Sequence, residues 1–465
     1  MQNRYSYLVK NTGILAISNF SSKILAFLLV PLYTRVLTTE EYGNYDFVST
    51  TIQLLIPILT ISICDAVVRY LMEEGISHKH VITVGMRFCL IGVVLFTIFI
   101  LVNRLFGEVY ALSEYACMSI LLFFSTVFYQ FTTSAAKGME KISMIAVAGV
   151  MSTLVMISTN IVFLLYLKMG IIGFFSAGIL SQFIPAIFLF FRLELTKYNQ
   201  AKINKDVRNV MIKYSMPLIL NTVGWWMNNA LDRYAVTFIC GAAANGVFSV
   251  AYKIPTILAT VQQIFIQAWQ ITAIKEYSKD SGAFYGKMMN FINMTMGMTC
   301  MALVLMTKLL AGFLYANDFY QAWQYVPFLL VSGVMNSASG ILGPILCADE
   351  NSRALGVSTF FGASINVVLN ILFVYAIGPQ GATIATLISS FAIYEFRSRA
   401  LVGKITYERK HVMGLSWLLL IVQAIVMIYL ENYLLQLVII CVYLFLYHRD
   451  IKKLILSTVN YLKNR

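Results

Sequence analysis

Residues 81–102, VITVGMRFCLIGVVLFTIFILV, contain a single charged side chain, Arg87. An α-helix of this length is about 33 Å long at 1.5 Å per residue, enough to cross the hydrocarbon core of a bilayer. Similar apolar stretches of roughly 20 residues recur along the chain, without the short polar–apolar alternation of membrane β-strands. The sequence therefore predicts an all-α polytopic membrane protein.

The composition supports a bilayer as the solvent of this chain. Of its 465 residues, 59% are hydrophobic and 12% are charged, and the mean hydropathy is +0.76. A soluble domain carries about 25% charged residues. The few charges here could not cover an aqueous surface of this size, and in lipid only helices or closed barrels satisfy the backbone.

About fourteen transmembrane helices are expected. No small-residue cleavage site follows the first apolar run, so we expect it to remain as a spanning helix and not to be a signal peptide. The expected spans are residues 13–33, 47–66, 81–102, 116–136, 142–167, 171–191, 214–240, 247–273, 288–310, 323–347, 354–377, 381–396, 412–430 and 433–447.

The distribution of basic residues predicts the orientation of these spans. With the N-terminus in the cytoplasm, 26 of the 34 Lys and Arg residues fall on the cytoplasmic side, four fall outside and four lie within spans. Cytoplasmic loops of membrane proteins carry this excess of Lys and Arg. We therefore expect both termini in the cytoplasm, and much of the net charge of +13 reflects topology.

The two halves of the chain resemble each other. Gly43 and Gly246 are 203 residues apart, and each precedes a long predicted helix that contains a proline, Pro57 or Pro255. Two further matches have similar offsets, namely Asn160 with Asn370 and Gly173 with Gly381. Short loops favour glycine in any case, but several matches at similar offsets indicate a duplication.

The duplication predicts the domain organisation. Each repeat has six spans, and an even number keeps the two repeats in the same orientation, as in several transporter folds with a central site. We expect an N-terminal six-helix lobe at 1–191, a basic cytoplasmic linker at 192–213 and a C-terminal six-helix lobe at 214–400. Residues 401–465 would add two helices and a basic cytoplasmic tail.

Polar residues form a continuous stripe along the eighth expected span. They follow one another at alternating steps of four and three, which places them on one helix face: Ser249, Lys253, Thr256, Thr260, Gln263, Gln267 and Gln270. Further polar positions lie in the first, second and seventh spans, at Asn19, Gln53, Asn221, Asn228 and Asp232. Such faces either bind helices to one another or line a hydrated cavity, and the length of the stripe favours the cavity.

Charged residues within the spans are candidates for substrate binding or ion coupling. Lys23, Arg233 and Lys253 are the candidate cavity cations, because a phosphate group is bound by several cationic donors. Lys253 could instead form a structural ion pair with Asp232. Asp65 and Asp232 are candidates for ion coupling, since carboxylates inside a membrane often mark ion pathways.

Four motifs carry a family resemblance. They are PLYTRVL at 31–37 followed by YGNY at 42–45, and LDRY at 231–234 followed by GVFSVAYK at 246–253. With these motifs the chain resembles, over nearly its whole length, the polysaccharide transporters, or O-antigen-type oligosaccharide flippases, of the multidrug/oligosaccharidyl-lipid/polysaccharide exporter superfamily.

The resemblance implies two six-helix lobes around a central cavity lined mainly by spans 1, 2, 7 and 8. It also implies a polyprenyl-pyrophosphate-linked oligosaccharide that moves from the cytoplasmic to the outer leaflet by alternating access, for surface polysaccharide biosynthesis. The location would be a bacterial inner membrane. Partners would be this lipid-linked substrate, membrane lipids and other polysaccharide assembly proteins, with no nucleic acid.

Two other functions are considered. A drug/cation antiporter of the same superfamily would favour embedded carboxylates, whereas the embedded charges here are mostly positive. A membrane-embedded polysaccharide-modifying enzyme would need a general base, but all four histidines lie in or beside predicted cytoplasmic loops. There is no Walker motif and no CxxC pair among the seven cysteines, so we expect neither a cofactor nor a metal.

Overall fold

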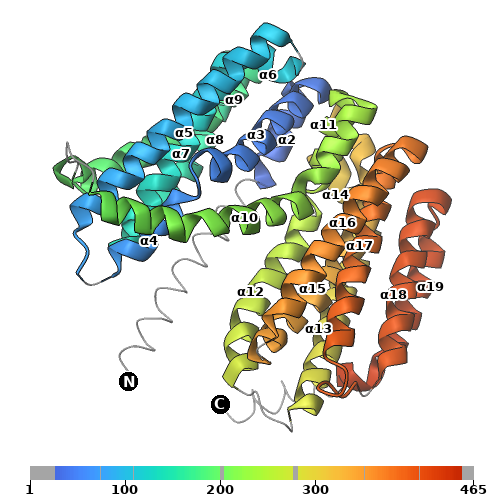
Figure 1. Ribbon diagram of the computed structural model, residues 1–465. Coiled ribbons are helices and arrows are strands. Elements are labelled where there is room, and N and C mark those ends of the chain that lie inside the picture. Colours follow the sequence, from blue (N-terminus) through green and yellow to red (C-terminus); the bar gives the residue numbers. More distant parts are fainter. Residues whose placement is uncertain are drawn as a thin grey trace, which may run out of the picture. The chain divides into compact units, whose positions relative to one another are not determined.

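The computed structural model describes residues 27–73, 75–107, 109–198, 204–275, 281–349, 351–407 and 409–452. Within these ranges the secondary structure consists of helices, and no strand occurs. The prediction of an all-α polytopic membrane protein is confirmed. The chain divides into two compact units (Figure 1).

The first unit runs to Thr237 and also takes in Gly241–Gly246 and Leu314–Asp318. The expected linker at 192–213 therefore lies inside this unit, and the helix that follows it stays with the first unit as far as Thr237. The helices of this unit are α2 (Val30–Val36), α3 (Thr39–Leu59), α4 (Ile63–Leu71), α5 (His78–Phe106), α6 (Tyr110–Glu114), α7 (Ala116–Gly138), α8 (Ile142–Asn160), the π-helix η1 (Ile161–Tyr166), α9 (Gly170–Arg192), η2 (Leu195–Tyr198) and most of α10 (Lys205–Cys240).

The second unit holds Phe238–Cys240, Val247–Phe313 and the chain from Phe319 onward. Its helices include the second half of α11 (Ala242–Ala251), α12 (Pro255–Lys275), α13 (Gly282–Leu305), most of α14 (Thr307–Leu314) and of η3 (Asn317–Gln324), α15 (Val326–Ala348), α16 (Ser352–Ile377), α17 (Pro379–Ala400), α18 (Lys410–Ile425), the π-helix η4 (Val426–Leu430) and α19 (Tyr433–Leu446).

The helices fit the expected spans. Eight helices in the described ranges are long and apolar enough to cross a membrane, and a ninth span results if the bent pair α3–α4 is counted as one. The other expected spans also fall on helices, except the first, 13–33, which lies mostly outside the described residues. Helices such as α5 and α19 leave Leu, Ile, Val and Phe side chains exposed, as lipid-facing surfaces do.

Two of the long expected helices are broken near their prolines. The span expected at 47–66 bends by 58° between α3 and α4, shortly after Pro57. The span expected at 247–273 is interrupted between α11 and α12, and Pro255 is the first residue of α12. The second and the eighth expected spans, which both carry predicted polar positions, are therefore discontinuous, and the backbone groups at such breaks are not all bonded within a helix.

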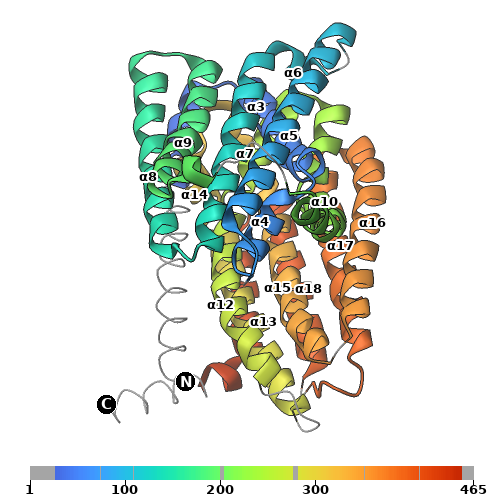
Figure 2. The same ribbon diagram turned by 60° about the vertical axis from the view of Figure 1, so that its left-hand side comes forward.

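Equivalent positions of the proposed repeats have the same local structure. The hairpin of α8 and α9 (Figure 2) and that of α16 and α17 (Figure 1) each pack closely. Asn160 and Asn370 are both buried, and each donates its amide to the carbonyl four residues earlier, Met156 at 2.7 Å and Asn366 at 2.9 Å. The shared geometry supports the duplication, which we retain as a proposal.

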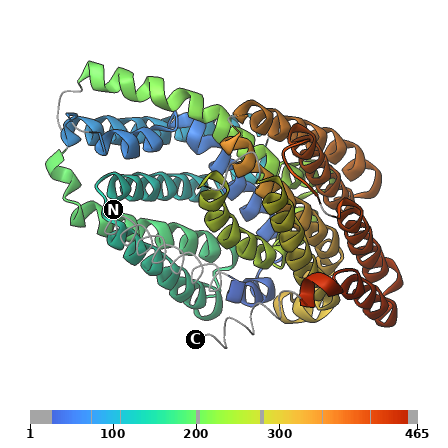
Figure 3. The same cartoon turned by 90° about the horizontal axis from the view of Figure 1, so that it is seen from below.

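The last two helices are joined to the second unit by a buried amide. Asn293 of α13 donates from Nδ2 to Ser416 Oγ on α18 and to the Tyr447 hydroxyl just after α19, both at 2.8 Å. Its Oδ1 accepts from Trp417 Nε1 at 2.6 Å. Figure 3 shows α18 and α19 side by side, next to the other helices of this unit. Both the Nδ2 and the Oδ1 atom of Asn293 therefore bond to residues within α18 or directly after α19.

Two glycines matched by the repeat touch each other within the first unit. A Cβ on Gly43 would lie 1.9 Å from the carbonyl oxygen of Ala242, and a Cβ on Gly246 would lie 1.9 Å from that of Thr39. The same Cβ positions lie within 3.1 Å of the other glycine's backbone nitrogen. The start of α3 therefore packs backbone against backbone on the start of α11, which requires glycine at both positions.

We predict that Gly43→Ala will lower the thermal stability of the purified protein by about 3 kcal/mol or more, because the new methyl group meets backbone and not a movable side chain. The control is Gly312→Ala in α14, where a Cβ meets nothing within 4 Å and stability should be unchanged or slightly higher. Intrinsic fluorescence during heating in detergent measures both variants. Equal midpoints for Gly43→Ala and the parent protein would contradict this packing.

Candidate functional site

The N-terminus of α3 is fixed by a capping box. The Thr38 hydroxyl accepts from the Glu41 backbone N–H at 3.1 Å, and the Glu41 carboxylate accepts from the Thr38 backbone N–H at 2.8 Å. Both bonds satisfy backbone donors that lack a partner within the helix. The cap lies at the start of α3, the helix that carries Asp46.

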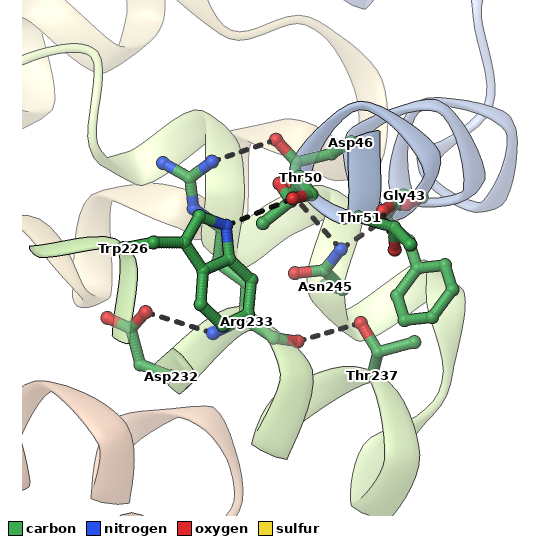
Figure 4. A network of polar contacts seen from close by, with 10 residues as sticks. Gly43, Asp46, Thr50, Thr51, Trp226, Asp232, Arg233, Thr237 and Asn245 are labelled. Carbon is green, nitrogen blue, oxygen red and sulfur yellow. Dashed lines mark hydrogen bonds and ion pairs between the residues drawn. The ribbon is translucent and has the colours of Figure 1, made fainter. Parts of the chain in front are cut away.

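Asp46 forms an ion pair with Arg233 of α10. Arg233 Nη1 donates to Asp46 Oδ1 at 3.1 Å, and the two side chains are 24% and 12% exposed, respectively. Asn245 of α11 donates to the Gly43 carbonyl at 3.3 Å and approaches Asp46 Oδ2 at 3.5 Å. One carboxylate thus connects three helices in the first unit (Figure 4).

Aromatic side chains of α10 extend the contact along α3. Trp226 Nε1 donates to the Thr50 carbonyl at 3.0 Å. The Tyr234 hydroxyl bonds to the Thr51 hydroxyl, and its ring lies 5.0 Å from that of Phe47. With the ion pair, these contacts join α3 and α10 over about two helical turns.

The candidate cation Arg233 therefore has a partner that sequence reasoning missed. Asp46 stands directly before the second expected span, where a carboxylate is easily interpreted as an interfacial residue. Asp46 directly follows the YGNY motif, and Arg233 lies within the LDRY motif. These two positions were the sequence signal that could have identified the pair. The guanidinium of Arg233 is balanced by Asp46 in this conformation, so any binding of an anion there would compete with the ion pair.

A pocket of about 180 Å³ lies at the break between α3 and α4. It is formed by the end of α3, the break itself, α4, α7 and α10, all in the first unit. Two predicted site residues, Gln53 and Asp65, line it. The complete lining is Gln53, Ile56, Pro57, Thr60, Ser62, Asp65, Thr126, Gln130 and Thr222.

The backbone at this break has an uncommon conformation. Ile61 and Ser62 have φ angles of 49° and 51°, in the left-handed region. A β-branched residue such as Ile61 rarely adopts it, and such strain persists only where the surrounding structure enforces it. The break thereby places Ser62 and Asp65, at the first turn of α4, against the pocket.

The polar stripe that includes Lys253 extends to both sides of the α11–α12 break. Lys253 lies in the turn between these helices, half-buried, and forms no ion pair with any residue that the structure describes. Ser249 is buried in α11, Thr260 is half-buried, and the exposed positions of α12 include Thr256, Gln263 and Gln270. The stripe therefore continues across an interruption between two helices and not along one continuous helix.

The remaining predicted residues are only partly located. Lys23 and Asn19 lie outside the described residues. Asn221 and Asn228 belong to α10 and Gln267 to α12, with side chains outside the described part of the structure. Asp232 is buried, and its carboxylate accepts from the Arg233 backbone N–H at 2.9 Å. Asp232 and Lys253 belong to different units, so the alternative ion pair between them stays a prediction.

The sequence matches a family model described as polysaccharide biosynthesis protein, over residues 8–274. The chain belongs to this family. The resemblance found in the motifs is thus confirmed. A curated relative, an uncharacterised membrane protein of Methanocaldococcus jannaschii, is 22% identical over 407 residues, which cover 83% of this chain and 96% of the relative.

Two solved transporters share the fold of this chain. The lipid II flippase MurJ, in an inward closed conformation, matches with a TM-score of 0.70 and 14% identity over 94% of this chain and 99% of that chain. An inward-facing multidrug resistance MATE family transporter of the MOP superfamily matches with a TM-score of 0.68 and 15% identity, over 84% of this chain and 99% of that chain. The family member described here is therefore a multi-pass membrane protein that shares its fold with these two transporters.

We predict that Asp46→Asn and Arg233→Gln will each lower the stability of the protein by about 2 kcal/mol. This value lies between those for exposed and for buried ion pairs, because each change leaves a partly buried charge unpaired. The double variant should lose less than the two single losses combined.

The matched control is Glu194→Gln, which breaks the exposed ion pair with Lys197 and should cost under about 0.5 kcal/mol. Thermal unfolding of the purified variants measures all four. Strictly additive losses in the double variant would show that Asp46 and Arg233 do not interact energetically.

Proposed function

We propose that this chain is a flippase that moves a polyprenyl-pyrophosphate-linked oligosaccharide from the cytoplasmic to the outer leaflet for surface polysaccharide biosynthesis. Its location would be a plasma membrane of bacterial type, with both termini in the cytoplasm. The family description, polysaccharide biosynthesis protein, and the shared fold with a lipid II flippase support a lipid-linked glycan as substrate.

The observation that carries the proposal is the state of Lys253. Its ammonium lies at a helix break within an expected span and has no carboxylate partner in the described structure. An embedded unpaired charge costs about 2.5–3.5 kcal/mol on insertion scales. Water and an anionic substrate group would offset this cost, and a pyrophosphate provides several acceptor oxygens for such a cation.

The proposed mechanism is alternating access. The sugar and pyrophosphate enter a hydrated site from the cytoplasm while the polyprenyl chain stays among the lipid tails. The headgroup is then released on the outer side of the membrane. Lys253 and Lys23 would bind the pyrophosphate. Arg233 would contribute once its ion pair with Asp46 opens, so substrate binding and the contact between α3 and α10 would be coupled.

The central test is transport in liposomes that contain the purified protein and a polyprenyl-pyrophosphate oligosaccharide. We expect Lys253→Ala and Lys23→Ala each to reduce the flipping rate about tenfold or more, since each removes a charged contact to phosphate. Lys141→Ala, an exposed lysine at the start of α8, should leave it unchanged. Flipping is measured by the access of a glycosidase to the sugar from the far side.

Cells that lack the protein should accumulate the lipid-linked precursor on the cytoplasmic face. Efflux of cationic dyes by the same liposomes, without flipping of the glycan lipid, would instead identify a drug/cation antiporter. Chemical alteration of the oligosaccharide by the purified protein would identify an enzyme. Either result would contradict the proposal.

A further inference from the structure

We propose that the second unit binds the phosphate of an anionic membrane phospholipid at Arg397, where α15, α16 and α17 pack together (Figure 1). Arg397 lies in the last turn of α17 and is 9% exposed. The distribution of Lys and Arg predicts that this end of α17 lies on the cytoplasmic side. This lipid would be distinct from the transported substrate, and its binding does not depend on the proposed function.

Three neutral groups accept hydrogen bonds from the Arg397 guanidinium. Nε donates to Ser358 Oγ at 3.0 Å, Nη2 donates to Thr359 Oγ1 at 3.0 Å, and Nη1 donates to the Ser339 carbonyl at 2.9 Å. A guanidinium has five N–H donors, so one N–H remains at each Nη atom. Two such donors match two oxygens of one phosphate group.

No carboxylate in the described structure balances the charge of Arg397. Two acidic residues on or beside the same helices are paired with other cations. Glu395 of α17 accepts from Arg399 at 2.7 Å, and Asp349, directly after α15, forms an ion pair with Lys404. A buried charge without a counter-charge is costly, so an anion from outside the chain would stabilise this one.

The first repeat has no charge at the equivalent place. In the proposed duplication, the glycine match has an offset of 208 residues, which places Leu189 opposite Arg397. The asparagine match has an offset of 210 residues, which places Ala148 opposite Ser358. Leu189 and Ala148 are both fully buried. Apolar side chains can therefore fill this position of the fold, and packing alone does not explain the arginine.

The Ser339 hydroxyl is the independent indication of a ligand. Ser339 is 3% exposed, and its Oγ has no hydrogen-bond partner in the described structure. By contrast, Ser332 and Ser337 on the same helix each donate to a carbonyl of α15 at 2.8 Å. A buried hydroxyl without a partner is costly. Because the Ser339 carbonyl accepts from Arg397, a phosphate bound to the guanidinium would also offer an acceptor oxygen to this residue.

The surface next to Arg397 is open and apolar, which favours a lipid over a free anion. Thr359 is half-buried, whereas Gly356 is exposed, and a Cβ on Gly356 would meet nothing within 4 Å. Phe360 is 76% exposed, as a residue among acyl chains would be. Arg353, one turn before Gly356, is exposed and adds a second positive charge. Basic pockets between transmembrane helices on the cytoplasmic side bind anionic lipid headgroups in this way.

Lipid binding by the purified full-length protein tests the site. Native mass spectrometry counts the phosphatidylglycerol molecules that the protein retains in detergent, and fluorescence during heating measures the stabilisation. We expect about one retained phosphatidylglycerol per chain and a higher unfolding midpoint with phosphatidylglycerol than with phosphatidylcholine. Arg397→Leu should weaken retention about tenfold, because it removes a charged donor to phosphate.

Arg397→Leu should still fold. Leucine occupies the equivalent position of the first repeat, and the Ser358 and Thr359 hydroxyls keep their bonds to the Leu355 carbonyl at 2.8 and 3.0 Å. Arg353→Gln changes an exposed side chain and should weaken retention about threefold, so it tests the site even if Arg397→Leu is unstable. The matched control is Arg399→Gln, whose arginine side chain is 77% exposed and which should retain lipid as the parent protein does.

Unchanged retention by Arg353→Gln, or by folded Arg397→Leu, would overturn the site. Equal losses in Arg399→Gln and Arg397→Leu would also overturn it, because they would indicate a diffuse attraction to surface charge. Equal stabilisation by inorganic phosphate in lipid-free detergent would overturn the assignment to a lipid. None of these measurements needs the glycan lipid, so failure of this site is distinguishable from failure of the flippase function.

Discussion

The structure depends on one constraint. Inside a bilayer, a charge or a backbone group without a hydrogen bond is costly unless a partner group or water interacts with it. Asp46 meets it by pairing with Arg233, and the pair joins α3 to α10 in the first unit. Asp65 and Lys253 have no such partner in the described structure, and each lies at or beside a helix break. Of these four charges, Asp46 and Arg233 form a structural pair, whereas Asp65 and Lys253 form no ion pair in the described structure.

Glycine and proline residues lie at the close backbone contact and at the helix breaks where these charges are found. Gly43 and Gly246 allow two backbones to meet, which places Asp46 and Asn245 at the same contact. Pro57 precedes the α3–α4 break and Pro255 follows the α11–α12 break. The two breaks do not fall at equivalent positions of the proposed repeats, because the matched offset of 203 residues carries the α3–α4 break into the interior of α12.

Much of the architecture could be predicted from sequence. The length of each apolar segment and the Lys and Arg residues beside it depend only on neighbouring residues in the chain. The site could be predicted only in part. The helical period identified Lys253 within the polar stripe, and polar or charged residues inside a span identified Gln53 and Asp65. Both signals assume a straight helix, so neither could locate the breaks. The partner of Arg233 lies 187 residues away. Neither charge pattern nor spacing identifies a pair of that separation, since its formation depends on how α3 and α10 pack.

The claim that the polar face of α12 meets water is tested most directly by thiol labelling. Single cysteines at Thr256, Gln263 and Gln270, in a variant without the seven native cysteines, would be treated with a membrane-impermeant maleimide. Labelling at these positions, and none at a lipid-facing site such as Phe360 of α16, is the expected result. If all three α12 positions are as unreactive as the lipid-facing site, with and without substrate, the hydrated-site account is contradicted.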